Sequence, residues 1–236
     1  MKKIFAAAIL TTALFIGCAS AEDVESSGAA SAPKEINHAD SIYYPQIDFY
    51  NMTSTADRII LPHYPTYQQT TEYSCGAAAA LTVLNYFGDK SFDEPTLIKL
   101  LKTKPKIGTS LGNMVKFFKG IGWDVQSSLD MPPFDEYAFQ KFVIENLSAG
   151  KPIIVENVDW GGHWRVIIGY DSLETSDLLY DDVLIFADPY DTSDHNQDGY
   201  AIQSFDRFFS MWFDNHILPE KERNQAWLIA TPKGDN

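Results

Sequence analysis

The sequence predicts an α+β domain in which helices come first and an antiparallel sheet follows. Residues 76–87 lack proline, contain four consecutive alanines and precede Gly88, a residue suited to the left-handed conformation just past a helix end. The second half contains short runs rich in isoleucine, valine and aromatic residues, bounded by glycine, proline and aspartate, as is typical of strands. Helices followed by strands favour two layers that bury one face of each against the other.

The expected helices lie mainly in the first half of the chain. Composition and apolar spacing predict them at 76–87, 94–101, 110–120 and 136–147, with Thr109 as the cap of the third. A further helical stripe is formed by Phe205, Phe208, Phe209, Trp212 and Phe213. Strands are expected at 58–61, 123–127, 152–158, 163–170, 182–187 and 226–230.

The size and charge of the chain limit the number of domains and the partners that we expect. The 236 residues are 45% hydrophobic and 14% aromatic, which suits one packed domain and a leader. The formal net charge is −14 at pH 7. Because such a chain is repelled by phosphates, we expect no nucleic-acid partner and no membrane contact except through a lipid anchor. We expect a monomer without a cofactor.

Residues 1–21 have the layout of a secretory signal peptide: two lysines, an apolar run over 4–16, and then small residues. Gly17 and Cys18 directly after this run favour a bacterial lipoprotein signal with Cys18 as the lipid attachment site. The small residues at 19–21 equally fit ordinary cleavage after Ala21. We therefore expect an exported protein of the bacterial cell envelope, lipid-anchored through Cys18, or periplasmic or secreted if it is cleaved at Ala21.

The remaining chain divides into a tether and a domain. Residues 22–55 are rich in serine, alanine, aspartate and glutamate, which predicts a flexible tether that becomes more ordered towards its end. Residues 56–236 form the predicted domain.

Cys75 is a candidate nucleophile because it lies at the predicted start of the helix over 76–87. Unpaired backbone N–H groups and the helix dipole favour a thiolate there, and the thiolate is the form that attacks. Gln69, six residues earlier, can add an amide donor to an oxyanion hole. The alternative is that Cys75 is a small buried residue of a core helix. Cys75 has no disulfide partner, because Cys18 is either lipidated or removed with the leader. An unpaired thiol in an exported chain favours the catalytic interpretation.

His163 and Asp188 are the candidate base and its orienting group. His163 begins one predicted strand and Asp188 ends the next. A hairpin loop centred near Ser176 would place the two directly opposite each other, with their side chains on one face of the sheet. A thiol, a base and a carboxylate in this order suit nucleophilic acyl transfer.

The ordered set of Gln69, Cys75-Gly76, His163-Trp164, Gly169-Tyr170-Asp171 and Asp188-Pro189 resembles the papain-like cysteine peptidases of family thirty-nine. The best-known members cleave bacteriocin leader peptides after a double glycine. The resemblance implies a papain-like fold, with Cys75 as nucleophile, His163 as base and then acid, and Asp188 as orienter. It also implies a peptide or protein substrate and an oxyanion role for Gln69. The neighbouring Gln68 is the alternative for this oxyanion role.

Other interpretations remain. The same three groups serve transglutaminase-like and peptidyl-transfer enzymes, in which an amine resolves the acyl-enzyme. A surface peptide-binding module without turnover is a third possibility. Residues 194–199 begin like a calcium loop, but Phe205 stands at the twelfth position where an acidic ligand is needed, so we expect no metal.

Overall fold

The computed structural model of the chain describes residues 43, 47–175, 178–193 and 197–234. The predicted leader at 1–21, Cys18 and most of the predicted tether lie outside the described residues. Within the tether range, Phe49 is buried and its ring lies 5.7 Å from that of Tyr200, so contacts with the domain begin before residue 56.

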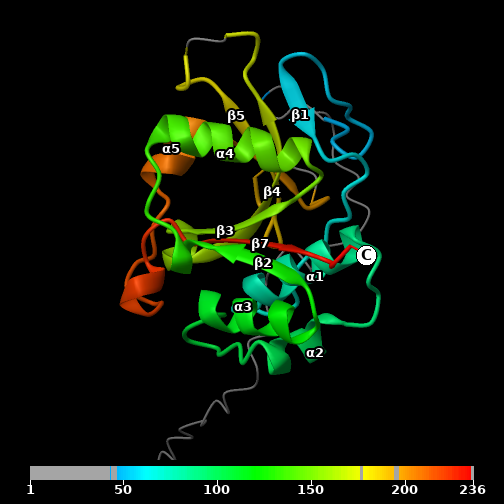
Figure 1. Cartoon of the computed structure of the whole chain (residues 1–236), viewed down its shortest axis with the longest axis vertical. Coiled ribbons are helices and arrows are strands. Elements are labelled where there is room, and N and C mark those ends of the chain that lie inside the picture. The colour runs from blue at the N-terminus through cyan, green and yellow to red at the C-terminus, as the bar shows by residue number, and fades with distance from the viewer. Residues whose placement is uncertain (1–42, 44–46, 176–177, 194–196, 235–236) are drawn as a thin grey trace, which may run out of the picture.

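A seven-stranded antiparallel sheet forms the centre of the molecule (Figure 1). The strand order is β2-β7-β3-β4-β5-β6, and β1 pairs with the far end of β4. The strands are β1 Arg58–Ile60, β2 Asp124–Ser127, β3 Ile153–Asn157, β4 His163–Asp171, β5 Val183–Ala187, β6 Tyr200–Ser204 and β7 Trp227–Thr231. The α+β prediction is confirmed, and β6 is the strand that was not predicted.

The helices cover both faces of this sheet. They are α1 Cys75–Tyr86, α2 Glu94–Leu100, α3 Leu111–Gly120, α4 Glu136–Ser148 and α5 Phe205–Ser210. Figure 1 shows α1, α2 and α3 on one side and α4 and α5 on the other. The sequence predicted one helical layer, whereas the aromatic stripes of α4 and α5 form a second one. Among the described residues, no helix is long and apolar enough to span a bilayer.

Two local expectations are wrong. Ser110 caps α3, because its side chain accepts the Asn113 N–H at 3.3 Å; Thr109 is instead buried, and its carbonyl accepts from Trp164 Nε1. The helix predicted to include Phe213 ends at Ser210. Beyond the helix, the Gln225 N–H donates to the Trp212 carbonyl, and Phe213 pairs with Asn224 in an isolated antiparallel bridge. Phe213 is therefore in an extended segment and is 44% exposed.

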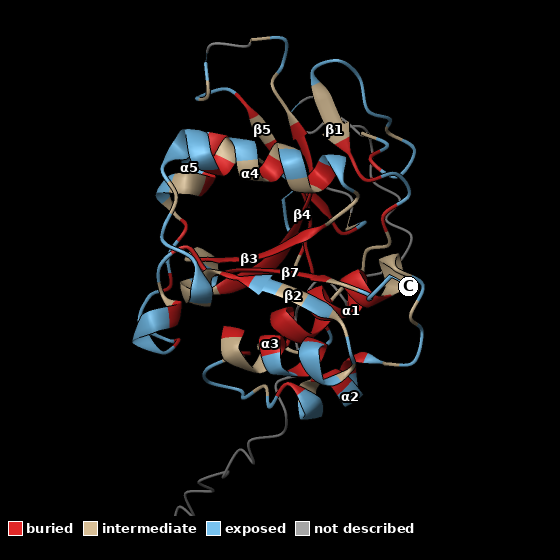
Figure 2. Ribbon diagram, viewed as in Figure 1, coloured by how far each residue is buried: buried red, intermediate tan, exposed pale blue. Residues whose placement is uncertain are grey.

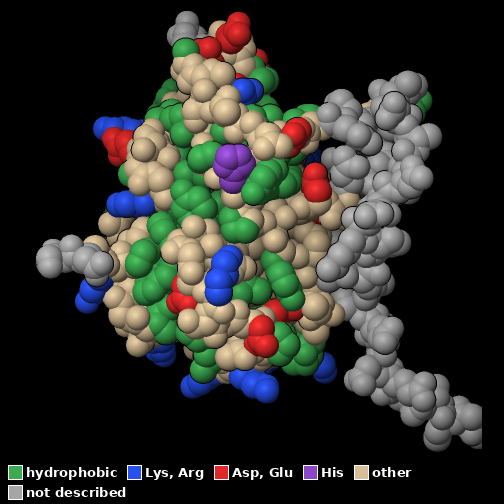
Figure 3. Space-filling view, turned by 90° about the vertical axis from the view of Figure 1, so that its right-hand side faces the viewer, with side chains coloured by type: hydrophobic (Ala, Val, Ile, Leu, Met, Phe, Trp, Pro, Cys, Tyr) green, Lys and Arg blue, Asp and Glu red, His purple; other side chains and the backbone are tan. Residues whose placement is uncertain are grey.

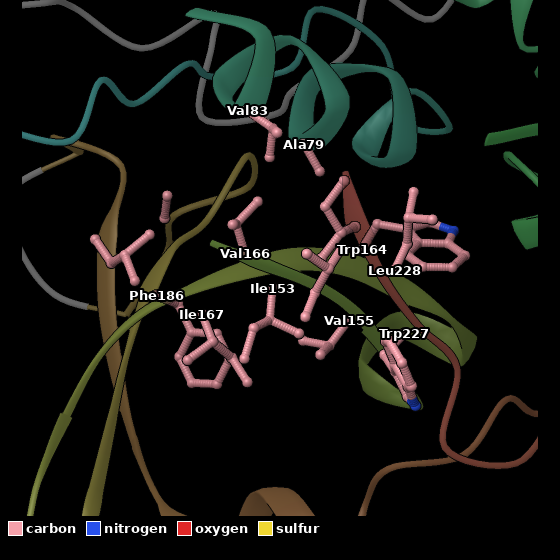
Figure 4. Packing of buried hydrophobic residues seen from close by; sticks show 14 of the residues in the cluster. Ala79, Val83, Ile153, Val155, Trp164, Val166, Ile167, Phe186, Trp227 and Leu228 are labelled. Atoms are coloured by element: carbon pink, nitrogen blue, oxygen red, sulfur yellow. The ribbon is translucent and has the colours of Figure 1, made fainter. Parts of the chain in front are cut away.

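The core lies on both sides of the strands, which Figure 2 shows as the most buried part of the fold. Ala79 and Val83 of α1 point towards Val166 of β4, and Ile167 and Phe186 lie on the opposite side of the sheet (Figure 4). The four alanines at 77–80 are completely buried, and such small side chains let the α1 backbone approach the sheet closely. The start of α1 therefore lies next to the start of β4.

The outer surface shows no continuous basic area on the face in Figure 3, as far as its residues are described. Lysine and arginine side chains stand apart there, among hydrophobic, acidic and uncharged polar ones.

Candidate active site

Cys75 is the first residue of α1, as the sequence predicts, and it is a free cysteine with 6% of its surface exposed. Ser74 occupies the cap position without capping the helix through its side chain. Its Oγ is instead bonded to Thr71, accepting from the Thr71 hydroxyl at 2.7 Å. Because the Ser74 side chain does not cap the helix, the positive end of the α1 dipole faces the Cys75 thiol without a competing cap.

His163 and Asp188 form a buried pair. His163 Nε2 lies 2.7 Å from Asp188 Oδ1, and the two residues are 4% and 8% exposed. Asp188 Oδ1 also accepts the Tyr190 N–H at 2.9 Å. Because Asp188 holds Nε2, Nδ1 is the ring nitrogen that can face Cys75.

The strand register behind this contact differs from the prediction. Val166 pairs with Ala187, so the continued register places Arg165, not His163, opposite Asp188. His163 reaches Asp188 diagonally from two residues away along β4. A shift of two residues preserves the face to which a strand side chain points, whereas a shift of one reverses it. The predicted contact therefore exists, although the predicted direct opposition is wrong.

Arg165 is a site residue that the sequence reasoning missed. It is 5% exposed, and its Nη1 lies 3.8 Å from Asp188 Oδ2. Its Nη2 donates to Gln203 Oε1 at 2.7 Å, and its guanidinium lies 4.2 Å from the centre of the Phe186 ring. The signal available in the sequence was its place two residues after His163, on the same face of the strand.

The opposite charges of His163 and Asp188 stabilise each other. Burial lowers the pKa of His163, but the charge and hydrogen bond of Asp188, with a further contribution from Cys75, raise it to about 9. Burial raises the pKa of Asp188, yet His163, Arg165 and the Tyr190 N–H lower it below its ordinary value. An imidazolium and a carboxylate are therefore the stable pair at neutral pH.

Gln69 and Gln68 have different surroundings. Gln69 is buried, and its Nε2 donates to the Thr71 carbonyl at 2.7 Å, which leaves the second hydrogen of this amide for another acceptor. Gln68 Nε2 donates to the Asp188 carbonyl at 2.8 Å. Gln69 lines a cavity of about 110 Å³ together with Cys75 and His163, whereas Gln68 does not line it.

A buried carboxylate holds the loop that carries Gln69. Glu94, at the start of α2, accepts the Thr70 N–H at 3.0 Å, the Thr70 hydroxyl at 2.6 Å and the Tyr67 hydroxyl at 3.1 Å. The Gln69 N–H donates to the Pro189 carbonyl at 2.8 Å. The loop is thus fixed both to the helical layer and to the segment that follows Asp188.

Trp160 and Tyr190 form an aromatic rim above the site. Trp160 is 72% exposed with a φ of 58°, and its ring meets that of Tyr190 edge-on at 5.6 Å. Both residues line the cavity of about 110 Å³. An adjoining cavity of about 160 Å³ shares Glu72, Cys75, Trp160 and Gly162 with it. The sequence reasoning did not single out this exposed tryptophan.

Metal ligands do not gather in the described part of the chain, where no group of three or more His, Cys, Asp or Glu side chains is placed to hold an ion. Residues 194–196 of the calcium-like loop lie outside the described residues. The described end of that loop is held by Asp191, whose Oδ2 accepts the Gly199 N–H at 3.1 Å.

The family comparison identifies the domain. A model of the Peptidase_C39 like family matches residues 62–213, which is more than half of the chain. The chain belongs to the Peptidase_C39 like family. The match includes all four predicted catalytic positions, and the C39-like domain is a cysteine peptidase domain. The resemblance inferred from the ordered motifs is confirmed.

Comparison with solved structures finds one peptidase domain of the same fold and a second, more distant similarity. The peptidase domain of Streptococcus ComA, a bi-functional ABC transporter involved in a quorum sensing pathway, is 21% identical, with 72% of this chain and 100% of that chain covered and a TM-score of 0.50. A double glycine motif protease from an AMS/PCAT transporter, in complex with the leader peptide, is 17% identical, with 72% and 91% covered and a TM-score of 0.49. No curated protein matches.

Proposed function

We propose that this C39-like domain is an exported peptidase that hydrolyses peptide bonds through Cys75, His163 and Asp188. One observation carries the proposal: Asp188 Oδ1 holds His163 Nε2 at 2.7 Å while His163 and Cys75 line the same cavity. A base that is oriented by a third group beside a thiol is the arrangement that covalent acyl transfer requires.

In the first half of the reaction, the Cys75 thiolate attacks the peptide carbonyl carbon. The C–N bond then breaks, and the His163 imidazolium gives its proton to the leaving amine. This leaves a thioester between Cys75 and the acyl part of the substrate.

In the second half, His163 accepts a proton from water, whose oxygen attacks the thioester carbon. The C–S bond breaks, the carboxylic acid leaves, and the thiolate and imidazolium are restored. Asp188 keeps the ring oriented and stabilises its charge in both halves.

Gln69 acts as a side-chain donor to the oxyanion. Its side chain borders the cavity that contains Cys75 and His163, and one hydrogen of its amide remains after the bond to Thr71. The second donor is the backbone N–H of Cys75 at the start of α1. Gln68 is used instead to hold the backbone of Asp188.

The location of the enzyme is part of the proposal. The leader within residues 1–21 acts as a lipoprotein signal that is cleaved before Cys18, and Cys18 carries a lipid, so the domain works at the bacterial cell envelope. The support is the apolar run over 4–16 followed by Gly17 and Cys18.

The test is incubation of the purified protein with a pool of random peptides, followed by mass spectrometry of the products. Hydrolysis yields two fragments, one with a new carboxyl terminus that carries oxygen from labelled water. Ligated products would instead favour the transferase alternative. No covalent intermediate and no cleavage, in wild type as in Cys75→Ala, would favour the binding module.

A further inference from the structure

Two buried carboxyl groups lie on the wall of the cavity that contains Cys75. Glu156 is on β3 and is 1% exposed, and Asp214 follows α5 and is 3% exposed. Both line the cavity of about 160 Å³ that Cys75 also lines. The proposed catalytic steps use neither residue.

On the cavity side, no described donor outside the pair reaches these carboxyl groups. Within the described part of the chain, no N–H or hydroxyl group donates to Glu156 Oε1, Glu156 Oε2 or Asp214 Oδ2, and the hydrogen bond between the two carboxyl groups uses a proton on Glu156. Asp214 Oδ1 does accept the Leu218 N–H, at 2.8 Å. Burying a carboxyl group without a donor costs free energy, so the oxygens that no donor reaches are available to a donor that enters the cavity.

Gly162 keeps this space open. A Cβ atom at position 162 would lie 2.8 Å from Glu156 Oε1 and 3.0 Å from Asp214 Oδ2. The φ of Gly162 is 170°, an extended conformation that any residue adopts. Glycine is therefore needed here for space and not for backbone conformation. The cavity is several times larger than the share of one water molecule, about 30 Å³.

Glu156 holds a proton that a bound cation can replace. Burial, the charge of Asp214, the nearby Cys75 and the hydrogen bond to Asp214 raise the pKa of Glu156 to about 10, so Glu156 retains a proton while no cation is bound. A substrate ammonium or guanidinium would let this proton leave to solvent and would supply charge-assisted hydrogen bonds to the oxygens that lack partners.

The cations among the described residues do not satisfy the pair. Arg223 Nε lies 4.0 Å from Asp214 Oδ1, the oxygen that already has a partner, and it donates to the Leu218 carbonyl at 2.7 Å. Lys106 lines the same cavity and is exposed, and no ion pair between described residues joins it to either carboxyl group.

We propose that Glu156 and Asp214 form a subsite for a lysine or arginine side chain of the peptide substrate, next to the bond that is cleaved. This inference rests on the proposed peptidase function, because the subsite borders the proposed nucleophile. Asp214 lies outside the family match at 62–213, so the subsite is assembled partly by a segment that the family match does not include.

The first test is the cleavage-site profile of the full protein on a random peptide pool. Basic residues should be enriched at one position beside the scissile bond. For a matched pair of peptides with lysine or norleucine at that position, the ratio of kcat/KM should fall by about tenfold or more in Glu156→Gln and in Asp214→Asn. Both substitutions keep the side-chain shape. Glu145→Gln is the matched control, because Glu145 is exposed on α4 and does not line the cavity.

The second test needs no turnover. The labelling rates of Cys75 by an aminoethyl and a sulfonatoethyl methanethiosulfonate, reagents of similar size and opposite charge, are compared. Their ratio should favour the cation and should fall at least about fivefold in Glu156→Gln and Asp214→Asn, but not in Glu145→Gln. Ratios that neither variant changes would overturn the subsite. A charge-dependent ratio without any peptide cleavage would retain the subsite and overturn the peptidase function instead.

Discussion

His163 Nε2 contacts Asp188 Oδ1 at 2.7 Å along a diagonal between β4 and the end of β5, and the position opposite Asp188 belongs to Arg165. Asp188 thus lies between an imidazole and a guanidinium, with Arg165 Nη1 3.8 Å from its other oxygen. Its two oxygens therefore face different cations. This arrangement fixes the imidazole from the buried side and leaves its remaining nitrogen towards Cys75.

Replacing Asp188 with asparagine should move the alkaline limit of activity to lower pH. The proposed mechanism needs the imidazolium, whose pKa of about 9 depends on the charge of Asp188 because burial alone lowers it. The profile of kcat/KM against pH should fall near pH 9 in the wild type and well below that in Asp188→Asn. An unchanged alkaline limit would show that another group sets it.

The same pKa has a consequence for stability. Since the folded pKa of His163, about 9, exceeds the ordinary 6.5, its stabilising contribution is complete below about pH 6.5 and is lost as the pH rises through about 9. Unfolding in urea at several pH values should show that this loss is smaller in Asp188→Asn than in the wild type.

Replacing Gln69 with alanine should separate thiol reactivity from catalysis. Alkylation of Cys75 forms no oxyanion, so labelling by iodoacetamide should persist while peptide cleavage falls by roughly a hundredfold or more. Gln68→Ala is the matched comparison. Equal losses of labelling and cleavage in Gln69→Ala would mean that Gln69 supports the structure of the loop and not the oxyanion.

Replacing Glu156 with glutamine should stabilise the fold at alkaline pH. The folded pKa of about 10 exceeds the ordinary 4.5, so between these values the native state holds a proton that the unfolded state releases. The stability of the wild type therefore decreases as pH rises through this window. Between about pH 6 and about pH 8, the advantage of Glu156→Gln in unfolding free energy should grow by roughly 1–3 kcal/mol. A constant difference would mean that Glu156 is ionised in the folded protein.

The lipid anchor is tested by labelling with radioactive palmitate. The label should enter the wild type and not Cys18→Ser, because Cys18 directly follows the apolar run. A mature chain that begins at Glu22 would contradict lipidation and show ordinary cleavage after Ala21.

Local patterns were enough to predict most elements and the four proposed catalytic positions. The alanine helix that begins at Cys75 and the strand that begins at His163 follow from composition and period. The exact register did not follow, because the pair nearest the loop, Asp171 with Val183, is already offset from the predicted register, and an irregularity between Ile167 and Gly169 shifts the register once more. A bulge depends on both strands, so one strand's sequence does not specify it.

The buried charges were not predictable for a related reason. Glu156 and Arg165 lie in strands whose other residues are mostly apolar. Their surroundings come from distant segments: Asp214 for the first, Gln203 and Phe186 for the second. Burial of a charged side chain is a property of the assembled layers. The alternation of residues along a strand indicates only which face of the sheet a side chain points to.

The most direct test of the account is the rate at which iodoacetamide modifies Cys75 at neutral pH, measured by mass spectrometry in the wild type, His163→Ala and the matched control His63→Ala. A thiolate paired with the His163 imidazolium should react much faster than a small-molecule thiol whose pKa is about 8.5. The account predicts that this excess is lost in His163→Ala and retained in His63→Ala. Labelling no faster than that of the small-molecule thiol, or equally fast in all three proteins, would contradict the role of Cys75 as an activated nucleophile.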